Sequence, residues 1–387
     1  MSDNSRPRRR FTKVQLKNWK NFAFCDVAVG KRAFLFGPNA SGKSNFLDVF
    51  RFLRDLAASG GGFQEAVGRR GGVSAIRCLA ARRDPDIEIR VVVADADGSS
   101  EWTYELSFNQ GKQSRAQIKK ERIELNSKLL LERPDSDDKR DPERLTQTHL
   151  EQVNVNLQFR ELASFFESIR YLHIVPQLVR EPDRSVGRTN DPFGGDFLEQ
   201  IAKTQGRTRL ARLKRIGDAL KVAVPQLAEI ELVRDHRGTP HLRGKYEHWR
   251  PRGAWQTENQ FSDGTLRLMG LLWVAMEGGG PLLLEEPELS LHLEIVRHLP
   301  LMFARVQRRT GRQIILSTHS PDLLRDEDIR LDEVLLLRPG AEGTEIKPAS
   351  VFSEIPRLLE SGSTLAEAVI LLTRPEHAER PSLFGDL

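Results

Sequence analysis

The sequence is poor in cysteine and contains no long hydrophobic run. Its 387 residues include two cysteines, Cys25 and Cys78. They are too few and too isolated for a disulfide framework or a four-ligand zinc site, so nothing requires an oxidising compartment. No run approaches the roughly 18 apolar residues of a membrane-spanning helix. The first arginines are not followed by the apolar core of a signal peptide, and we expect a cytoplasmic protein that contacts no membrane.

An excess of charge of one sign is also absent. The chain has 59 Lys and Arg residues against 54 Asp and Glu residues, a net charge of +5. This balance tolerates an anionic partner without requiring one. The length and the 39% hydrophobic content are typical of a soluble globular protein with one large or two ordinary domains. Residues 1–10, which include four arginines, predict a disordered basic tail.

The most informative motif lies at residues 37–44, which fit the pattern G-x-x-x-x-G-K-[ST]. An apolar strand is predicted at 33–36 before it and an amphipathic helix at 46–56 after it, and this context argues against a chance match. The backbone amides of such a loop wrap phosphates. We expect Lys43 to reach the β and γ phosphates and the Ser44 hydroxyl to bind Mg²⁺. The predicted nucleotide contacts are Gly37, Pro38, Asn39, Ala40, Ser41, Gly42, Lys43, Ser44 and Asn45.

Two adjacent carboxylates follow another apolar strand, predicted at 282–285. The carboxyl ends of strands are the ligand-binding edge of open α/β sheets. We therefore assign Glu285 to the metal, and Glu286, on the opposite face of the strand, to the polarisation of the attacking water. Without the phosphate motif, a strand that ends in solvated acids would explain the pattern equally well.

Two further motifs carry candidate phosphate contacts. His319 follows a strand predicted at 313–317 and could sense a γ-phosphate or be an ordinary turn residue; the neighbouring motifs favour the sensor. Ser262 is a natural N-cap for a helix predicted at 263–276. That helix start, which also includes Asp263 and Gly264, could meet a γ-phosphate presented by another subunit.

The rest of the chain predicts alternating elements. Strands and helices alternate after residue 262, which indicates a parallel sheet, whereas residues 11–131 contain mostly strands. Residues 133–144 are nearly all charged or proline and predict a solvated loop. Further predictions are helices at 150–168 and 196–223, a strand at 169–175 and a hairpin at 230–246.

The motifs, in this order, resemble the ATP-binding head of the ABC ATPase superfamily, in the branch of RecF, SMC heads and the overcoming-lysogenization-defect ATPases. Residues 18–22 resemble its N-F-K-x-F element, 262–267 its S-D-G-T-x-R signature, and 285–289 its E-E-P-E form of Walker B. Ser290-Leu291-His292 falls at the D-loop and His319 at the switch histidine. The resemblance implies an α/β P-loop NTPase of ABC-head type, with a mixed β-sheet, flanking helices, an N-terminal antiparallel part and a helical lobe.

The resemblance also implies a function. Two heads would sandwich two ATP molecules with Mg²⁺, which makes an ATP-bound homodimer and an ATPase of AAA type. Action in DNA repair or maintenance, or in anti-phage defence with a separate effector or nuclease chain, is implied as well. No coiled-coil arm is evident, and about 70 residues after His319 are too few for a Toprim nuclease. Gln177 is the candidate for the glutamine lobe, against a plain surface glutamine.

Two other readings stay open. A nucleotide-gated scaffold with little turnover gains weight because Glu285 stands where most ABC proteins have Asp. An ATPase subunit of a transporter would show a transporter-like signature, which Asp263 and Thr265 do not provide.

We expect one head over residues 11–387. Its parts are an N-terminal lobe with the phosphate loop (11–132), an inserted helical and β region (133–260), a C-terminal lobe with the other motifs (261–350) and a C-terminal helical extension (351–387).

A basic stretch lies in the inserted region. Its six basic residues, with no acid among them, are Lys203, Arg207, Arg209, Arg212, Lys214 and Arg215. The stretch from Lys203 to Arg215 predicts a helix with a basic outer face that could bind DNA backbone phosphates or could simply be solvated. The histidines at 236, 241 and 248 lack the spacing of a metal site.

Overall fold

The structure is a computed structural model that describes residues 9–82, 84–111, 114–185, 191, 193–247 and 254–374. Most of the predicted basic tail lies outside these residues. The chain forms two compact units. Unit 1 comprises Met1–Arg170, Gly279–Leu283 and Gly311–Leu387, and unit 2 comprises Tyr171–Gly278 and Leu284–Thr310. The lobes predicted from the sequence have other bounds, and that division stays a prediction.

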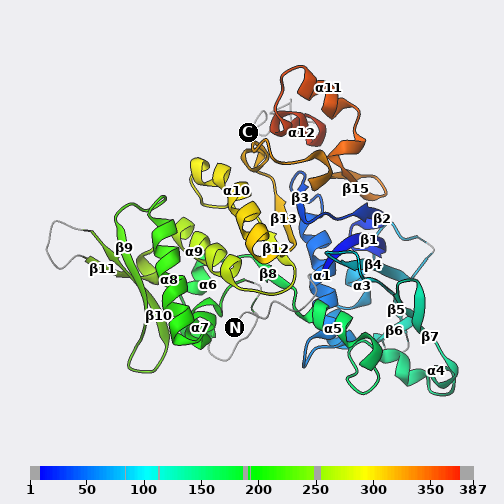
Figure 1. Ribbon diagram of the computed structural model, residues 1–387. Coiled ribbons are helices and arrows are strands. Elements are labelled where there is room, and N and C mark those ends of the chain that lie inside the picture. The colour runs from blue at the N-terminus through cyan, green and yellow to red at the C-terminus, as the bar shows by residue number, and fades with distance from the viewer. Residues whose placement is uncertain are drawn as a thin grey trace, which may run out of the picture. The chain divides into compact units, whose positions relative to one another are not determined.

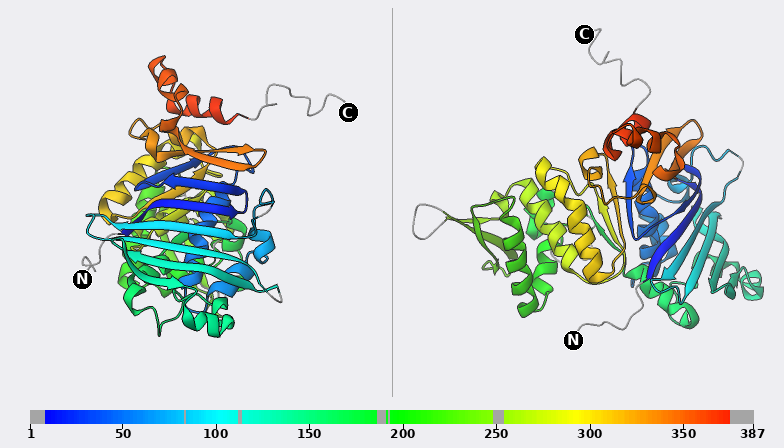
Figure 2. Two further views of the ribbon diagram at one scale, coloured as in Figure 1. Left: turned by 90° about the vertical axis from the view of Figure 1, so that its right-hand side faces the viewer. Right: turned by 45° about the horizontal axis from the view of Figure 1, so that its top comes forward.

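Unit 1 contains a six-stranded antiparallel sheet, of order β2-β1-β4-β5-β6-β7. Figure 2 shows these blue and cyan strands side by side. Every second residue of β4 is buried, as period-two alternation of apolar residues predicts for a sheet covered on one face. The strands are β1 (Arg9–Trp19), β2 (Phe22–Ala28), β4 (Ile87–Asp95), β5 (Glu101–Gln110), β6 (Ala116–Leu125) and β7 (Lys128–Arg133).

A second sheet has the order β15-β14-β3-β13-β12-β8. The strand β3 is parallel to both β13 and β14, and every residue of β3 and β13 is buried, which explains the apolar runs at 33–36 and 314–316. This mixture of sheets and flanking helices confirms the predicted α/β fold class. The strands are β3 (Arg32–Phe36), β8 (Arg170–Leu172), β12 (Leu282–Glu285), β13 (Ile314–Thr318), β14 (Val334–Gly340) and β15 (Gly343–Pro348).

Aromatic side chains join the antiparallel sheet to its helices. The ring of Phe11 on β1 lies 4.7 Å from that of Phe50 on α1 (Lys43–Ala57) and 5.1 Å from that of Phe165 on α5 (Arg160–Glu167). Each buried phenylalanine stabilises the fold by about 1.5–3 kcal/mol. The remaining α-helices of unit 1 are α2 (Phe63–Gly68), α3 (Val73–Ile76), α4 (Ser136–Arg140), α11 (Glu354–Glu360) and α12 (Leu365–Thr373).

Two sequence predictions in this unit are wrong. The helix predicted at 150–168 begins only at Arg160, because the Asn156 amide donates to the Leu150 carbonyl and closes a local turn. The prediction of a solvated loop at 133–144 is wrong in part: most of these residues are exposed, but they include α4, and the side chains of Arg133 and Asp138 are fully buried. Arg133 donates to Asp138 at 2.8 and 2.9 Å and to buried Glu121 at 3.1 Å, so each charge has a partner inside the core.

Unit 2 combines a small sheet with helices, and Figure 1 shows α8 beside that sheet. The predicted helix at 196–223 is two helices, which break at Thr204 and Gln205. The helix at 263–276 and the strand at 282–285 have the predicted bounds. In the described part of the chain, no helix has the length and apolar character needed to span a membrane. The elements of unit 2 are α6 (Pro176–Val179), α7 (Phe197–Lys203), α8 (Gly206–Leu220), β9 (Leu227–Arg234), β10 (Pro240–Tyr246), β11 (Ala254–Thr257), α9 (Asp263–Met276) and α10 (Leu293–Thr310).

Candidate functional site

The phosphate loop connects β3 to α1 in unit 1. Two of its residues have left-handed backbones, Ala40 with φ 60° and Gly42 with φ 95°. A Cβ atom on Gly42 would lie 2.0 Å from the Asn21 amide nitrogen, and one on Gly37 would lie 2.6 Å from the Leu337 carbonyl oxygen. Close packing therefore requires glycine at both positions, and it brings the loop backbone to the start of a 15-residue helix, where anions are favoured.

The charged and polar groups of the loop are already ordered. The ammonium group of Lys43 donates to the carbonyl oxygens of Gly37 and Pro38 at 2.8 and 3.0 Å. The Ser41 hydroxyl is buried and has no hydrogen-bond partner within the described residues. Asn39, Ala40 and Ser44 are exposed. The loop thus offers a buried lysine, Lys43, an unpaired hydroxyl, Ser41, and several exposed residues. This arrangement fits the phosphates of a nucleotide.

Asn21, in the turn between β1 and β2, supports this loop. Its amide nitrogen donates to the Ser41 carbonyl at 3.1 Å and to the Thr344 hydroxyl at 2.7 Å. Its amide oxygen accepts a hydrogen bond from the Asn45 side chain at 2.8 Å. The backbone amide of Thr344, on β15, donates in turn to the Asn21 carbonyl at 2.7 Å. The sequence gives no signal for the contact between Asn21 and Thr344, because no local pattern links positions 323 residues apart.

His319 lies at the same edge of unit 1 as the phosphate loop. Thr318 on β13 pairs in parallel with Phe36 on β3. Consequently His319 and Gly37 are the first residues after two neighbouring strands. The side chain of His319 is exposed, and a hydrogen bond from the Ser320 amide to the Thr318 hydroxyl, at 2.9 Å, closes the turn around it.

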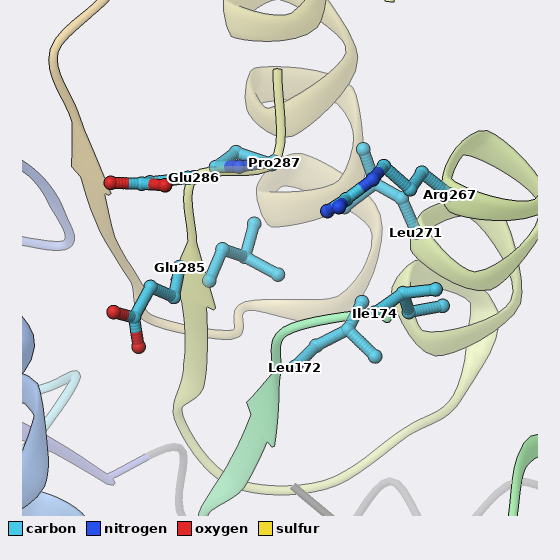
Figure 3. A pocket seen from close by; sticks show the side chains of 8 residues that line it. Leu172, Ile174, Arg267, Leu271, Glu285, Glu286 and Pro287 are labelled. Carbon is cyan, nitrogen blue, oxygen red and sulfur yellow. The ribbon is translucent and has the colours of Figure 1, made fainter. Parts of the chain in front are cut away.

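Glu285, the last residue of β12, and Glu286, which follows it, belong to unit 2. The Tyr171 hydroxyl donates to the Glu285 carboxylate, and Nδ1 of His173 lies 3.2 Å from the Glu285 carbonyl oxygen. Glu286 has a left-handed backbone with φ 45°. Figure 3 shows its carboxylate on the same side of the chain as that of Glu285. The predicted alternation of faces is wrong here because the strand ends at Glu285 and the backbone turns at Glu286.

A small hollow adjoins these acids within unit 2. Figure 3 shows Arg267 of α9 extended towards Pro287, on the side away from the two carboxylates. Burial lowers the pKa of Arg267, while the nearby carboxylates of Asp263, Glu286 and Glu288 oppose that shift. The lining residues are Leu172, Ile174, Arg267, Leu271, Leu284, Glu285, Glu286 and Pro287.

The start of α9 is built as the sequence predicts. The Ser262 hydroxyl accepts a hydrogen bond from the Thr265 amide at 3.2 Å and thereby caps the helix. A Cβ atom on Gly264 would lie 2.4 Å from the Ser290 carbonyl oxygen. Glycine at this position therefore lets the D-loop backbone approach the signature stretch, while Ser262 itself stays exposed.

A comparison with family models identifies the chain. Residues 32–325 match a family described as "AAA domain, putative AbiEii toxin, Type IV TA system". The chain belongs to this family. The match covers about three quarters of the sequence and includes the phosphate loop, the signature, the paired acids and the histidine of this AAA domain. No curated protein matches it.

Solved structures show the fold of the AAA domain. It is similar to an SMC head bound to the C-winged helix domain of ScpA, with a TM-score of 0.55 and 13% identity over 87% of this chain and 96% of that one. It is also similar to an SMC head with an extended coiled coil, bound to the C-terminal domain of ScpA derived from Pyrococcus furiosus. There the TM-score is 0.53 and the identity 12%, over 92% of this chain and all of that one. The AAA domain thus has the fold of SMC-type ATPase heads, as the resemblance implied.

The two units divide the predicted site residues of the AAA domain. Unit 1 brings the phosphate loop together with His319. Unit 2 holds the signature stretch, Glu285, Glu286 and Gln177, which is exposed on α6. Within the described residues, no three His, Cys, Asp or Glu side chains are grouped to hold a metal, and Ser44 and Glu285 stay predicted magnesium ligands.

Unit 2 also shows two residues that sequence reasoning missed, Tyr171 and Arg180. Arg180 follows α6, and its guanidinium donates to the Phe261 carbonyl at 2.7 Å and to the Asp263 carboxylate at 2.6 Å. Neither contact has a local signal, since the Arg180 and Asp263 positions lie 83 residues apart.

The basic stretch lies on α7 and α8 of the AAA domain. Arg209 donates to the Ala202 and Thr204 carbonyls, and Arg212 lies over the Trp273 ring at 5.2 Å. These two arginines therefore stabilise the fold. The remaining four side chains, Lys203, Arg207, Lys214 and Arg215, are exposed.

The histidine-rich region has a structural explanation in part. Nδ1 of His241 lies 2.6 Å from the buried Glu258 carboxylate, and Nε2 lies 3.8 Å from Asp235. His241 thus belongs to an ion pair of the small sheet. His248 lies outside the described residues.

Proposed function

We propose that this AAA domain binds ATP with Mg²⁺, hydrolyses it, and forms a homodimer in its ATP state. The observation that carries the proposal is the phosphate loop, whose glycines, buried Lys43 and neighbouring His319 lie together at one edge of unit 1. Lys43 would bind the β and γ phosphates, and His319 would sense the γ-phosphate. The family membership of the chain supports this assignment.

Metal binding and water activation complete the proposed reaction. Ser44 and Glu285 would hold Mg²⁺, which when bound neutralises charge on the phosphates. Glu286 would accept the proton of the attacking water, and Gln177 would act as the residue of the glutamine lobe. Ser262, Asp263 and Gly264 would meet the γ-phosphate held by the other copy. Two phosphates, each bound by both copies, would favour the closed dimer until hydrolysis removes them.

The first test is the Glu286→Gln variant. We expect its turnover to fall at least 100-fold, because a positioned general base contributes about 10²–10⁴-fold. Size-exclusion chromatography with light scattering on the Glu286→Gln protein should show a monomer that becomes a dimer when Mg-ATP is added. Glu294→Gln, an exposed acid on α10, is the matched control and should hydrolyse ATP like the wild type. Equal turnover in wild type and Glu286→Gln would disprove the role of Glu286.

A second candidate function is a nucleotide-gated scaffold that binds ATP but hardly hydrolyses it. The Tyr171 hydroxyl engages the Glu285 carboxylate, which favours this alternative if the tyrosine competes with the metal for that carboxylate instead of orienting it. The same experiment separates the two functions. A scaffold would dimerise with ATP in the wild type and show no burst of phosphate release.

We further propose DNA as a partner, bound through the four exposed basic residues of α7 and α8. Neutralising them together should weaken binding of a short duplex and reduce the slope of log K against log salt by up to about 3.6, since each phosphate contact contributes about 0.9. Fluorescence anisotropy at several salt concentrations measures this slope. The control replaces four exposed basic residues of unit 1 with glutamine, namely Lys119, Lys128, Lys139 and Arg140. Equal slopes in both variants would contradict the assignment.

The cellular role we propose is anti-phage defence with a separate effector or nuclease chain, with DNA repair or maintenance as the alternative. The family description names a putative toxin of a type IV toxin–antitoxin system, which supports defence. The SMC heads of the solved structures are bound to domains of ScpA, which supports a partner chain. Defence predicts that Glu286→Gln abolishes protection in a plaque assay. Maintenance predicts unchanged plaques and greater sensitivity to DNA damage.

A further inference from the structure

A carboxylate stands in the stretch that the proposed function assigns to a partner's γ-phosphate. Asp263 is the first residue of α9, and 39% of its side chain is exposed. Like charges in a partly exposed site repel each other strongly enough to alter binding. A phosphate-accepting helix start that contains an unpaired Asp would therefore oppose the dimerisation it is meant to support.

Arg180 removes this conflict. One of its terminal nitrogens donates to the Asp263 carboxylate at 2.6 Å and to the Phe261 carbonyl at 2.7 Å. Within the described residues it is the cation that pairs with Asp263; Arg267, one turn along α9, makes no ion pair with it. The Arg180 side chain is 23% exposed, so solvent screens the pair only partly.

The same contacts fix the backbone around the cap. Arg180 holds residues 261 and 263, and the Ser262 hydroxyl between them caps α9. Ser262 is exposed, whereas Asp263 is drawn towards Arg180. Arg180 also follows α6, which carries Gln177, so one side chain links the predicted glutamine lobe to the signature stretch.

We propose that Arg180 is a positioning residue that neutralises Asp263 and thereby makes the signature stretch able to accept an ATP γ-phosphate from a second copy of this chain. This inference rests on the proposed function. It assigns the ability of the stretch to accept a phosphate to the Arg180–Asp263 charge pair.

The test is a charge rescue in the Glu286→Gln background, which slows hydrolysis. Light scattering during titration with Mg-ATP gives the ATP concentration at half-dimerisation. We expect Arg180→Met to raise this concentration about tenfold, within the usual range of coupling energies, because Asp263 then loses its ion-pair partner. Adding Asp263→Asn should return it to within about threefold of the parent. Arg180→Lys, which keeps the charge, should lie close to the parent.

Controls separate this role from a structural one. Arg243→Met removes another half-exposed arginine–carboxylate pair of unit 2 and should leave half-dimerisation unchanged. Binding of a fluorescent ATP analogue to the monomer should also stay unchanged in Arg180→Met, because the phosphate loop is intact. Two outcomes would overturn this inference and leave the proposed function standing. In one, the variant with both Arg180→Met and Asp263→Asn needs as much ATP as Arg180→Met; in the other, Arg180→Met dimerises like its parent. A parent that ignores ATP would overturn the proposed function and this inference together.

Discussion

The side-chain amide of Asn21 donates a hydrogen bond to the Thr344 hydroxyl at 2.7 Å, across 323 positions of the chain. The same amide supports the phosphate loop through the Ser41 carbonyl. The hairpin of β14 and β15 thus helps to hold the loop in its phosphate-binding shape, although none of its residues belongs to a nucleotide motif.

Replacement of Asn21 tests this support. Asn21→Ala removes three side-chain hydrogen bonds, two of them to Ser41 and Asn45 of the loop, and we expect ATP affinity to fall about tenfold because preorganisation of the backbone amides is lost. Thr344→Val should lower affinity in the same direction but by less, since the bond to Ser41 remains. Calorimetry with Mg-ATP measures both. Asn109→Ala, which removes a hydrogen bond from β5 of the antiparallel sheet to Asp86, is the control. An unchanged ATP affinity in Asn21→Ala would show that the phosphate loop keeps its conformation without the Asn21 side chain.

Tyr171 offers a test of the metal assignment. Its hydroxyl orients the Glu285 carboxylate, and loss of such an outer hydrogen bond typically costs 10–100-fold in metal affinity. We therefore expect Tyr171→Phe to raise the Mg²⁺ concentration for half-maximal hydrolysis about tenfold, without a change in nucleotide binding measured in EDTA. Tyr246→Phe, a half-exposed tyrosine of the same unit, should match the wild type. A lower Mg²⁺ requirement would mean that the tyrosine competes with the metal.

The buried network around Arg133 should dominate the stability of its part of unit 1. Arg133→Met leaves the buried Glu121 carboxylate without a cation and Asp138 with Arg144 alone, at 3.6 Å, and we expect the free energy of unfolding to fall by about 3–5 kcal/mol. Urea denaturation followed by tryptophan fluorescence measures it. Arg140→Met, which removes an exposed pair with Asp137, should change it by less than about 1 kcal/mol.

A triple variant shows whether the loss of stability in Arg133→Met comes from the unpaired charges or from packing. Combining Arg133→Met with Glu121→Gln and Asp138→Asn removes all three charges and should recover much of the lost stability. If the triple variant is as unstable as Arg133→Met, the loss comes from packing.

The His241 ion pair predicts a pH dependence of stability. Burial lowers the pKa of His241, but the carboxylates of Glu258 and Asp235 outweigh burial, and the pKa in the folded protein is raised above the usual 6.5. The pair therefore stabilises the fold fully below about pH 6.5 and loses this contribution as the pH rises through the raised pKa. The difference in unfolding free energy between wild type and His241→Gln should shrink from pH 5.5 to 8.5. His298→Gln, an exposed histidine on α10, should show no such trend.

Local signals explain which parts of the molecule the sequence predicts well. The helix Asp263–Met276 has the predicted bounds because Ser262 caps it and its apolar residues follow the helical period. The strand Leu282–Glu285 is similarly marked by three leucines that end at a charge. Both signals lie within the element itself, so no distant contact is needed to interpret them.

The contacts that refine the site are not local. Asn21 with Thr344, and Arg180 with Asp263, pair side chains that only the fold brings together. The charge of Arg133 predicts a solvated position, because its partner Glu121 lies on another strand and no local pattern reveals it. The orientation of Glu286 cannot be predicted for a different reason, since an even alternation along the strand does not reveal a left-handed backbone after its end.

The left-handed backbone of Glu286 has a consequence for directed evolution. A residue with a side chain in this conformation costs about 1–2 kcal/mol, and glycine relieves the cost. Libraries screened for heat resistance alone should therefore enrich Glu286→Gly. If Glu286 activates water as proposed, the thermostable Glu286→Gly variants will no longer hydrolyse ATP. Screens of this protein should accordingly select for hydrolysis and heat resistance in the same round.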